Sequence, residues 1–197
     1  MTDQKTDNQD PTGKLLLREY FLKKYHANAP DVLDCCQATG YLWKKLKTKY
    51  SVRLYMGLDV KPKKGRLKLD SVRYLKAGKW KHDIIDIDTY GSPWDHYEQV
   101  LKYMGKEITV FLTIGQLTTG AVGRISKTGL SAMGLRNLYT TLPPAFHVKL
   151  KDKYINYCLG MCYKKSIMII DAQEAVTYGN ARYIGLRLER EKDDSNI

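Results

Sequence analysis

The sequence predicts an α/β protein built on one open sheet, mostly parallel, that ends in an antiparallel hairpin. Short apolar stretches alternate with helical stretches or loops at intervals of roughly 20 residues, which is typical of a parallel sheet with crossover connections. Four successive apolar stretches end in a carboxylate. The final two apolar stretches of the chain flank Gly179 and Asn180, which supply a hairpin turn.

The first half of the chain is expected to form two helices and four strands. The first helix covers residues 14–27 and has one apolar face. That face comprises Leu15, Leu16, Tyr20, Phe21 and Tyr25. The second helix covers residues 38–50 and turns inward the side chains of Leu42, Trp43 and Leu46. The four strands are expected over residues 31–36, 53–60, 65–70 and 81–88.

The second half is expected to form two helices, one strand and the hairpin. Residues 93–104 read as a helix with a proline in its first turn, and residues 107–115 read as the fifth strand. A further helix, opened by prolines, covers residues 143–165, and the hairpin lies within residues 166–189. Residues 115–142 are rich in glycine, threonine and serine, so we expect a mobile basic excursion there.

Length and composition predict a single domain. We expect a disordered lead over residues 1–13, one domain over residues 14–190 and a frayed tail over residues 191–197. No apolar run approaches the roughly 20 residues that span a membrane. The polar N-terminus lacks the apolar segment of a secretory signal. These features predict a cytoplasmic protein.

The four cysteines are expected to be reduced core residues. Cys35 and Cys36 follow an apolar strand, whereas Cys158 and Cys162 are four residues apart and therefore share a helix face. The four histidines show no ligand spacing with them, so we expect no metal site.

The charge distribution predicts a polyanionic partner. The formal net charge is +12. Fourteen lysines and arginines lie between Tyr41 and His82, where the acids are Asp59 and Asp70. Such a basic stretch suits nucleic acid, and a solvated surface tuned for solubility is the alternative. The candidate phosphate-binding residues are Lys61, Lys63, Lys64, Arg66, Arg124, Lys127 and Arg136.

The carboxylates at the strand ends predict a ligand site. In open α/β sheets, ligands bind beyond the carboxyl ends of the strands, near the point where the strand order reverses. The acids expected there are Asp34, Asp59, Asp70, Asp86 and Asp88. Asp59 is placed to accept hydrogen bonds from ribose hydroxyls, and Asp70 to accept one from an adenine amine. Taken singly, each of these two is equally well explained as a helix cap or turn.

The turn after the first strand indicates what the ligand is. A dinucleotide site would need G-x-G-x-x-G there, and this chain has C-C-Q-A-T-G. The stretch VLDCCQATGYLW instead resembles the class I S-adenosylmethionine-dependent methyltransferases, in which an acid is followed by a small-residue turn that commonly ends in Gly-Thr-Gly. Asp34, Thr39 and Gly40 match this pattern, and Ala38 stands at a usual glycine. For Gly40 alone, a plain strand-to-helix turn is the alternative.

The resemblance covers roughly residues 14–190 and implies a Rossmann-like class I methyltransferase sheet. It also implies that the chain binds S-adenosyl-L-methionine. The implied cofactor-binding residues are Asp34, Thr39, Gly40, Asp59, Asp70 and Ser71.

The stretch DIDTYGSP is similar to the Asp-Pro-Phe-Gly-Ser-Pro motif of the tRNA guanine dimethyltransferases. Asp88 aligns with the catalytic acid, Thr89 replaces a proline and Tyr90 replaces a phenylalanine. The resemblance implies that Asp88 and Tyr90 are catalytic. Asp88 would accept the hydrogens of an exocyclic amine, and Tyr90 would stack on the base, a contact worth about 1–3 kcal/mol. An Asp-rich turn with a buried tyrosine is the alternative.

Asp86 lies two residues before Asp88 on an extended strand, so the two side chains should point the same way. Asp86 therefore either faces the same site or binds a helix terminus.

Together these features predict a methyltransferase that acts on an exocyclic amino group of a base in RNA or DNA. RNA is favoured because its splayed bases and shape suit a compact enzyme. One alternative is a methyltransferase of the same fold that acts on a protein amide or a small molecule. The other is a non-catalytic nucleic-acid-binding module with a decayed pocket, which Ala38 and the missing proline leave open.

Overall fold

The computed structural model describes residues 11–61, 67–89, 92–114, 151–175 and 181–191. The strands are β1 (Asp31–Asp34), β2 (Leu54–Asp59), β3 (Leu67–Lys68), β4 (Ile84–Ile87), β5 (Glu107–Ile114), β6 (Ile167–Ala175) and β7 (Arg182–Arg190). The helices are α1 (Thr12–Tyr25), α2 (Tyr41–Leu46), α3 (Ser71–Lys76), α4 (Trp94–Tyr103), α7 (Lys151–Leu159) and the 3₁₀ helix η4 (Gly160–Lys165).

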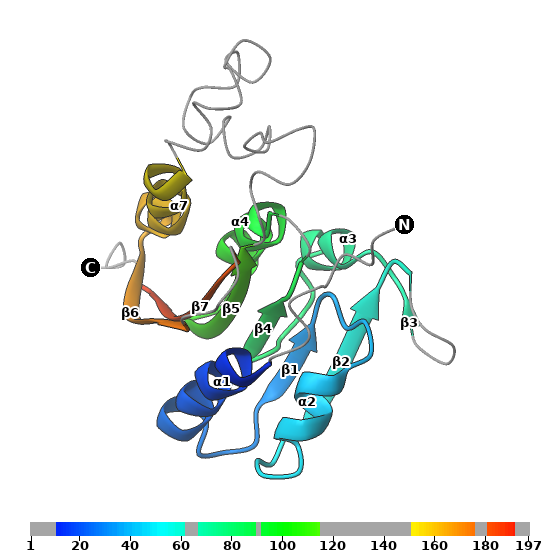
Figure 1. The fold of residues 1–197 in the computed structure, drawn as a ribbon. Coiled ribbons are helices and arrows are strands. Elements are labelled where there is room, and N and C mark those ends of the chain that lie inside the picture. Colours follow the sequence, from blue (N-terminus) through cyan, green and yellow to red (C-terminus); the bar gives the residue numbers. More distant parts are fainter. Residues whose placement is uncertain (1–10, 62–66, 90–91, 115–150, 176–180, 192–197) are drawn as a thin grey trace, which may run out of the picture.

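The seven strands form one sheet in the order β3-β2-β1-β4-β5-β7-β6 (Figure 1). Strands β1 to β5 pair in parallel, whereas β7 runs antiparallel to both β5 and β6. The predicted α/β sheet, mostly parallel with a C-terminal antiparallel hairpin, is confirmed. The hairpin turn itself, the expected excursion at 115–142 and the start of the helix expected at 143 lie outside the described residues.

Two hydrophobic cores form because successive residues of a strand face opposite sides of the sheet. On β4, Ile84 faces the core that α1 and α2 cover, and Ile85 faces the core that α3, α4 and η4 cover. The first core is centred on Phe21 and Trp43, both fully buried, and the second contains the buried Trp94. Figure 1 shows α1 and α2 on one side of the sheet and α3, α4 and α7 on the other.

The orientation of α1 differs from the predicted one. Leu16 is 60% exposed and Tyr20 is 37% exposed, so two of the five residues assigned to the apolar face point outward. Lys14 and Arg18, one helical turn apart, are buried in their place. The helix is rotated toward these two cations because the face of β4 that it covers carries carboxylates.

The predicted core is confirmed in most positions. The four cysteines are free thiols, and Cys35, Cys158 and Cys162 are buried, whereas Cys36 and Leu42 are only partly buried. Helix α3 was not predicted from the sequence. No helix in the described ranges has the length and apolar character needed to cross a membrane.

Candidate functional site

The acids predicted at the strand ends lie along one edge of the sheet. Strand β1 has β2 on one side and β4 on the other, so the strand order reverses between β1 and β4. Asp34 ends β1 and is paired in register with Asp86 of β4. Asp59 ends β2, and Asp88 follows β4 directly. The carboxyl ends of these parallel strands therefore bring the acids to the position where such sheets bind ligands.

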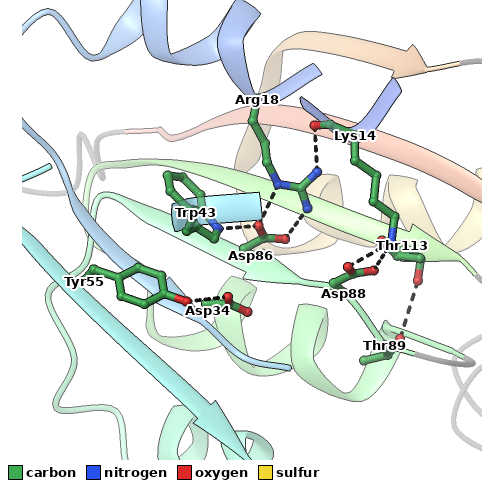
Figure 2. Close-up of polar contacts among 9 residues, drawn as sticks. All are labelled: Lys14, Arg18, Asp34, Trp43, Tyr55, Asp86, Asp88, Thr89 and Thr113. Carbon is green, nitrogen blue, oxygen red and sulfur yellow. Dashed lines mark hydrogen bonds and ion pairs between the residues drawn. The ribbon is translucent and has the colours of Figure 1, made fainter. Parts of the chain in front are cut away.

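Asp86 is held by a buried ion pair. Arg18 donates from Nε and Nη2 to the two carboxylate oxygens at 2.7 and 2.6 Å, and the indole N–H of Trp43 donates to Oδ2 at 2.7 Å (Figure 2). Asp86 is 1% exposed. Asp86 and Asp88 do point the same way, toward α1. Among the described residues, however, the partners of the Asp86 carboxylate are the side chains of Arg18 and Trp43 rather than a helix terminus. Asp86 joins α1 and α2 to the sheet.

Asp88 is held by a second, more open ion pair. Lys14 Nζ lies 2.7 Å from Oδ1 and 2.8 Å from Oδ2 (Figure 2). The Lys14 side chain is 7% exposed, whereas that of Asp88 is 22% exposed. The next residue, Thr89, donates its hydroxyl to the carbonyl of Thr113 at 3.4 Å, which ties the exit of β4 to β5. Asp88 thus keeps one accessible side.

Asp34 is the third carboxylate of this group and is almost fully buried. The Tyr55 hydroxyl donates to its Oδ2 at 2.8 Å. Burial, together with the neighbouring charge of Asp86, raises the pKa of Asp34 to about 8. At neutral pH, Asp34 is therefore largely protonated, and the two cations of α1 are matched by the two carboxylates that they contact.

The turn after β1 is built around two left-handed residues. Gly40 has φ +66° and Ala38 has φ +44°, and both conformations favour glycine. The structure therefore explains why glycine would be usual at position 38. Gln37 is buried and donates from Nε2 to the Tyr55 hydroxyl at 3.1 Å. The Gln37 amide fills the space where a Cβ on residue 57 would lie, so a glycine is required there.

Asp59 fixes this turn from the neighbouring strand. Its Oδ2 accepts the backbone N–H of Ala38 at 2.9 Å, and its Oδ1 accepts that of Lys61 at 2.8 Å. A carboxylate has about four lone-pair positions, so each oxygen retains capacity for a further donor such as a ribose hydroxyl.

Asp70 and Ser71 begin α3. Asp70 is the N-cap, and its Oδ1 accepts the backbone N–H groups of Val72 and Arg73. The cap that was one of the two expectations for Asp70 is therefore present. The buried Ser71 hydroxyl lies 2.8 Å from Nε2 of His96 on α4. Burial lowers the pKa of His96, so this imidazole is neutral at pH 7.

The structure describes only some of the other predicted site residues. Thr39 and Lys61 are exposed. The remaining residues lie outside the described ranges: Lys63, Lys64, Arg66, Tyr90, Arg124, Lys127 and Arg136. Their roles stay predictions.

The site also contains residues that the sequence did not reveal: Lys14, Arg18, Gln37, Trp43, Tyr55 and His96. The i, i+4 spacing of Lys14 and Arg18 was the available signal, because it places two cations on one helix face.

Comparisons with known proteins give the fold. No family model matches the chain, and no curated protein matches it. Among solved structures, TYW2 from M. jannaschii in complex with AdoMet is 12% identical, with a TM-score of 0.52 over 91% of this chain and 77% of that chain. Trm1 from Pyrococcus horikoshii with S-adenosyl-L-methionine is 13% identical, with a TM-score of 0.58 over 93% of this chain and 54% of that one.

The plantazolicin methyltransferase BpumL in complex with SAH is 12% identical, with a TM-score of 0.55 over 94% of this chain and 87% of that chain. This chain thus spans about half of Trm1 and most of BpumL. With its strand order and its antiparallel C-terminal hairpin, the chain has the α/β fold of the class I methyltransferases.

Proposed function

We propose that this protein is an S-adenosyl-L-methionine-dependent methyltransferase that acts on an exocyclic amino group of a base in RNA or DNA. The observation that carries the proposal is the common edge formed by Asp34, Asp59 and Asp88, on either side of the strand-order reversal.

The residues beside the reversal suit S-adenosyl-L-methionine. Asp59 has unfilled lone pairs for ribose hydroxyls and already orders the Ala38 backbone. The left-handed Gly40 keeps the start of α2 free of a Cβ where a ligand would approach. Asp34 lies level with Asp86, at the centre of the edge. Although Asp34 is largely protonated in the free protein, the positive amino group of the methionine portion, once bound beside it, would favour the ionised form.

The acceptor half of the reaction belongs to Asp88. An exocyclic amine on a base is a weak nucleophile because its lone pair is delocalised into the ring. A carboxylate that accepts the amine hydrogens localises that lone pair and orients it. When bound, the cofactor would supply an electrophilic sulfonium methyl group, and S-adenosylhomocysteine would be the leaving group. Asp88 holds the amine during transfer, and the surplus proton leaves through it or to water.

Exposed cations support a nucleic acid as the acceptor. Between residues 41 and 82, every described lysine and arginine is exposed. They are Lys44, Lys45, Lys47, Lys49, Arg53, Lys61, Lys68, Arg73, Lys76, Lys79 and Lys81. They lie on α2, β3 and α3 and in the adjoining loops. Lys61, Lys68 and Arg73 are within three residues of Asp59 or Asp70, so a phosphate backbone bound to them would run close to the proposed site.

A small-molecule or peptide acceptor is the second candidate. It is favoured by the likeness to BpumL, a plantazolicin methyltransferase that this chain covers to 87% of its length. A non-catalytic module is the third candidate. It is favoured by Ala38, which has a left-handed conformation where a cofactor-binding turn would usually have glycine.

One experiment separates these three functions. The purified protein is titrated with S-adenosylhomocysteine by calorimetry, and then incubated with tritiated-methyl S-adenosyl-L-methionine and total RNA, DNA or protein. We expect cofactor binding and label in the nucleic-acid fraction. Label only in the protein fraction, or cofactor binding with no label in any of the three fractions, would support the second candidate, and no cofactor binding would support the non-catalytic module.

A further inference from the structure

Lys14, in the first turn of α1, has its ammonium group enclosed between Asp88 and β7. Its ammonium contacts both oxygens of Asp88 and lies 4.6 Å from the ring centroid of Tyr183, a buried residue of β7. A lysine ammonium has three N–H donors, and two of them are placed on Asp88. Only 7% of the Lys14 side chain is exposed, so the ammonium faces Asp88 and the Tyr183 ring rather than solvent.

Among the described residues, the side-chain partner of Asp88 is Lys14, and 22% of the Asp88 side chain is exposed. Lys14 uses one lone-pair position on each oxygen, and each oxygen has about two such positions. The outer positions are on the exposed side of the carboxylate. An exocyclic amine has two hydrogens, so it fits the part of Asp88 that Lys14 leaves open.

The first turn of α1 is itself anchored. Arg18 donates from Nη1 to the Lys14 carbonyl at 2.9 Å while its other nitrogens bind the buried Asp86. Phe21 and Leu22, further along the helix, lie in the core. Lys14 is therefore presented to Asp88 from a fixed position rather than from a free end of the chain.

We propose that Lys14 is a positioning residue for the acceptor carboxylate: it holds both oxygens of Asp88 from inside so that the outer lone pairs face the amine to be methylated. This inference rests on the proposed function, because it requires Asp88 to act on the acceptor. A cation that merely blocked Asp88 would have the opposite effect on the rate, so the two roles are distinguishable.

The test compares Lys14→Met with Lys24→Met. Lys24 lies on the same helix and forms an ion pair of similar length, 2.8 Å, with Asp171, far from the strand ends. Apparent kcat and KM are measured with total RNA and tritiated-methyl S-adenosyl-L-methionine, and cofactor binding and Tm are measured alongside. We expect Lys14→Met to lower kcat roughly 100-fold with little change in KM, as for a misplaced catalytic group. Lys24→Met should leave both at wild-type values.

One further variant distinguishes positioning from a loss of folded protein. Lys14→Arg keeps a cation within reach of Asp88 and should recover part of the rate. A Lys14→Met protein that had merely lost its fold would also lose cofactor binding and have a lower Tm than Lys14→Arg.

Each other outcome contradicts the inference in its own way. Higher activity of Lys14→Met would show that Lys14 blocks the site. Equal activity of Lys14→Met and Lys24→Met would overturn the inference alone. Absence of methyl transfer by the wild-type protein would overturn the proposed function as well.

Discussion

Asp34, Asp86 and Asp88 lie close together at the carboxyl edge of the sheet, but each has a different environment and therefore a different role. Asp86 is closed in by Arg18 and Trp43, which makes it structural. Asp88 has one engaged side and one open side, which suits an acceptor site. Asp34 lacks a cation of its own and accepts a hydrogen bond from Tyr55, so it is the member whose protonation changes near neutral pH.

Asp88→Asn should abolish methyl transfer while cofactor affinity stays within a few-fold of wild type, because the side chain acts on the acceptor. The matched control is Asp31→Asn, which also breaks an ion pair, the one with Arg53 at 2.7 Å, but at the amino-terminal end of β1. Transfer assays and calorimetry on both variants check this. Retained transfer by Asp88→Asn would remove Asp88 from the mechanism.

Asp34 makes the stability of the fold depend on pH. Burial first, and then the charge of Asp86, raise its pKa from 3.8 to about 8. Between these values the folded protein holds a proton that the unfolded chain releases, so stability falls as pH rises through this window, by up to about 1.4 kcal/mol per pH unit.

Asp34→Asn should remove this dependence while keeping an oxygen that can accept from Tyr55. Urea unfolding of the two proteins at a series of pH values checks it: the difference in stability should grow in favour of Asp34→Asn from pH 4 to pH 8. Parallel curves over this range would show that Asp34 does not bind the proton assigned to it.

Strand β4 and helices α1 and α3 show which elements the sequence could predict and which it could not. Strand β4 was predictable because a short apolar run ends in acids, and its alternation correctly gave Asp86 and Asp88 a common direction. The face of α1 was not, because the partners that decide it lie 68 and 74 residues away along the chain. Helix α3 was not predicted, because a ligand-binding acid and a helix cap were equally open readings of Asp70, the residue that caps it.

The turn after β1 carries a strain that a single substitution can test. Ala38 has φ +44°, a conformation that costs an alanine about 1–2 kcal/mol relative to the right-handed region. Ala38→Gly should therefore stabilise the protein by about 1 kcal/mol, measured by urea unfolding. Ala77→Gly is the control, because Ala77 has φ −65° and gains nothing from glycine. Equal destabilisation by both changes would show that the turn is relaxed with alanine.

At the scale of the whole molecule, charge is distributed unevenly around the sheet. The acids of the proposed site occupy the carboxyl edge, whereas the exposed cations of residues 41–82 lie on α2, β3 and α3 and in the adjoining loops. Under the proposed function, the cations would hold phosphates, and the carboxylates would bind the cofactor and the amine.

Replacing Lys61, Lys63, Lys64 and Arg66 together by alanine should weaken nucleic-acid binding and flatten its salt dependence. Each lost phosphate contact on a single strand lowers the slope of log K against log salt by roughly 0.7. Fluorescence anisotropy with labelled RNA over a salt series measures this slope. The control replaces four exposed lysines elsewhere: Lys23, Lys24, Lys102 and Lys106. If the two sets lower the slope equally, the basic stretch is only a solvated surface.

The most direct measurement is mass spectrometry of nucleosides from total RNA and DNA after incubation with S-adenosyl-L-methionine that carries a deuterated methyl group. The central claim is that Asp34, Asp59 and Asp88, at the reversal of the strand order, bind the cofactor and the base amine side by side. Wild-type protein should then produce a base-methylated nucleoside with the deuterated label, and Asp88→Asn should produce none. Two results would contradict this claim: no labelled nucleoside after incubation with a wild-type protein that binds the cofactor, or equal labelling by wild type and Asp88→Asn.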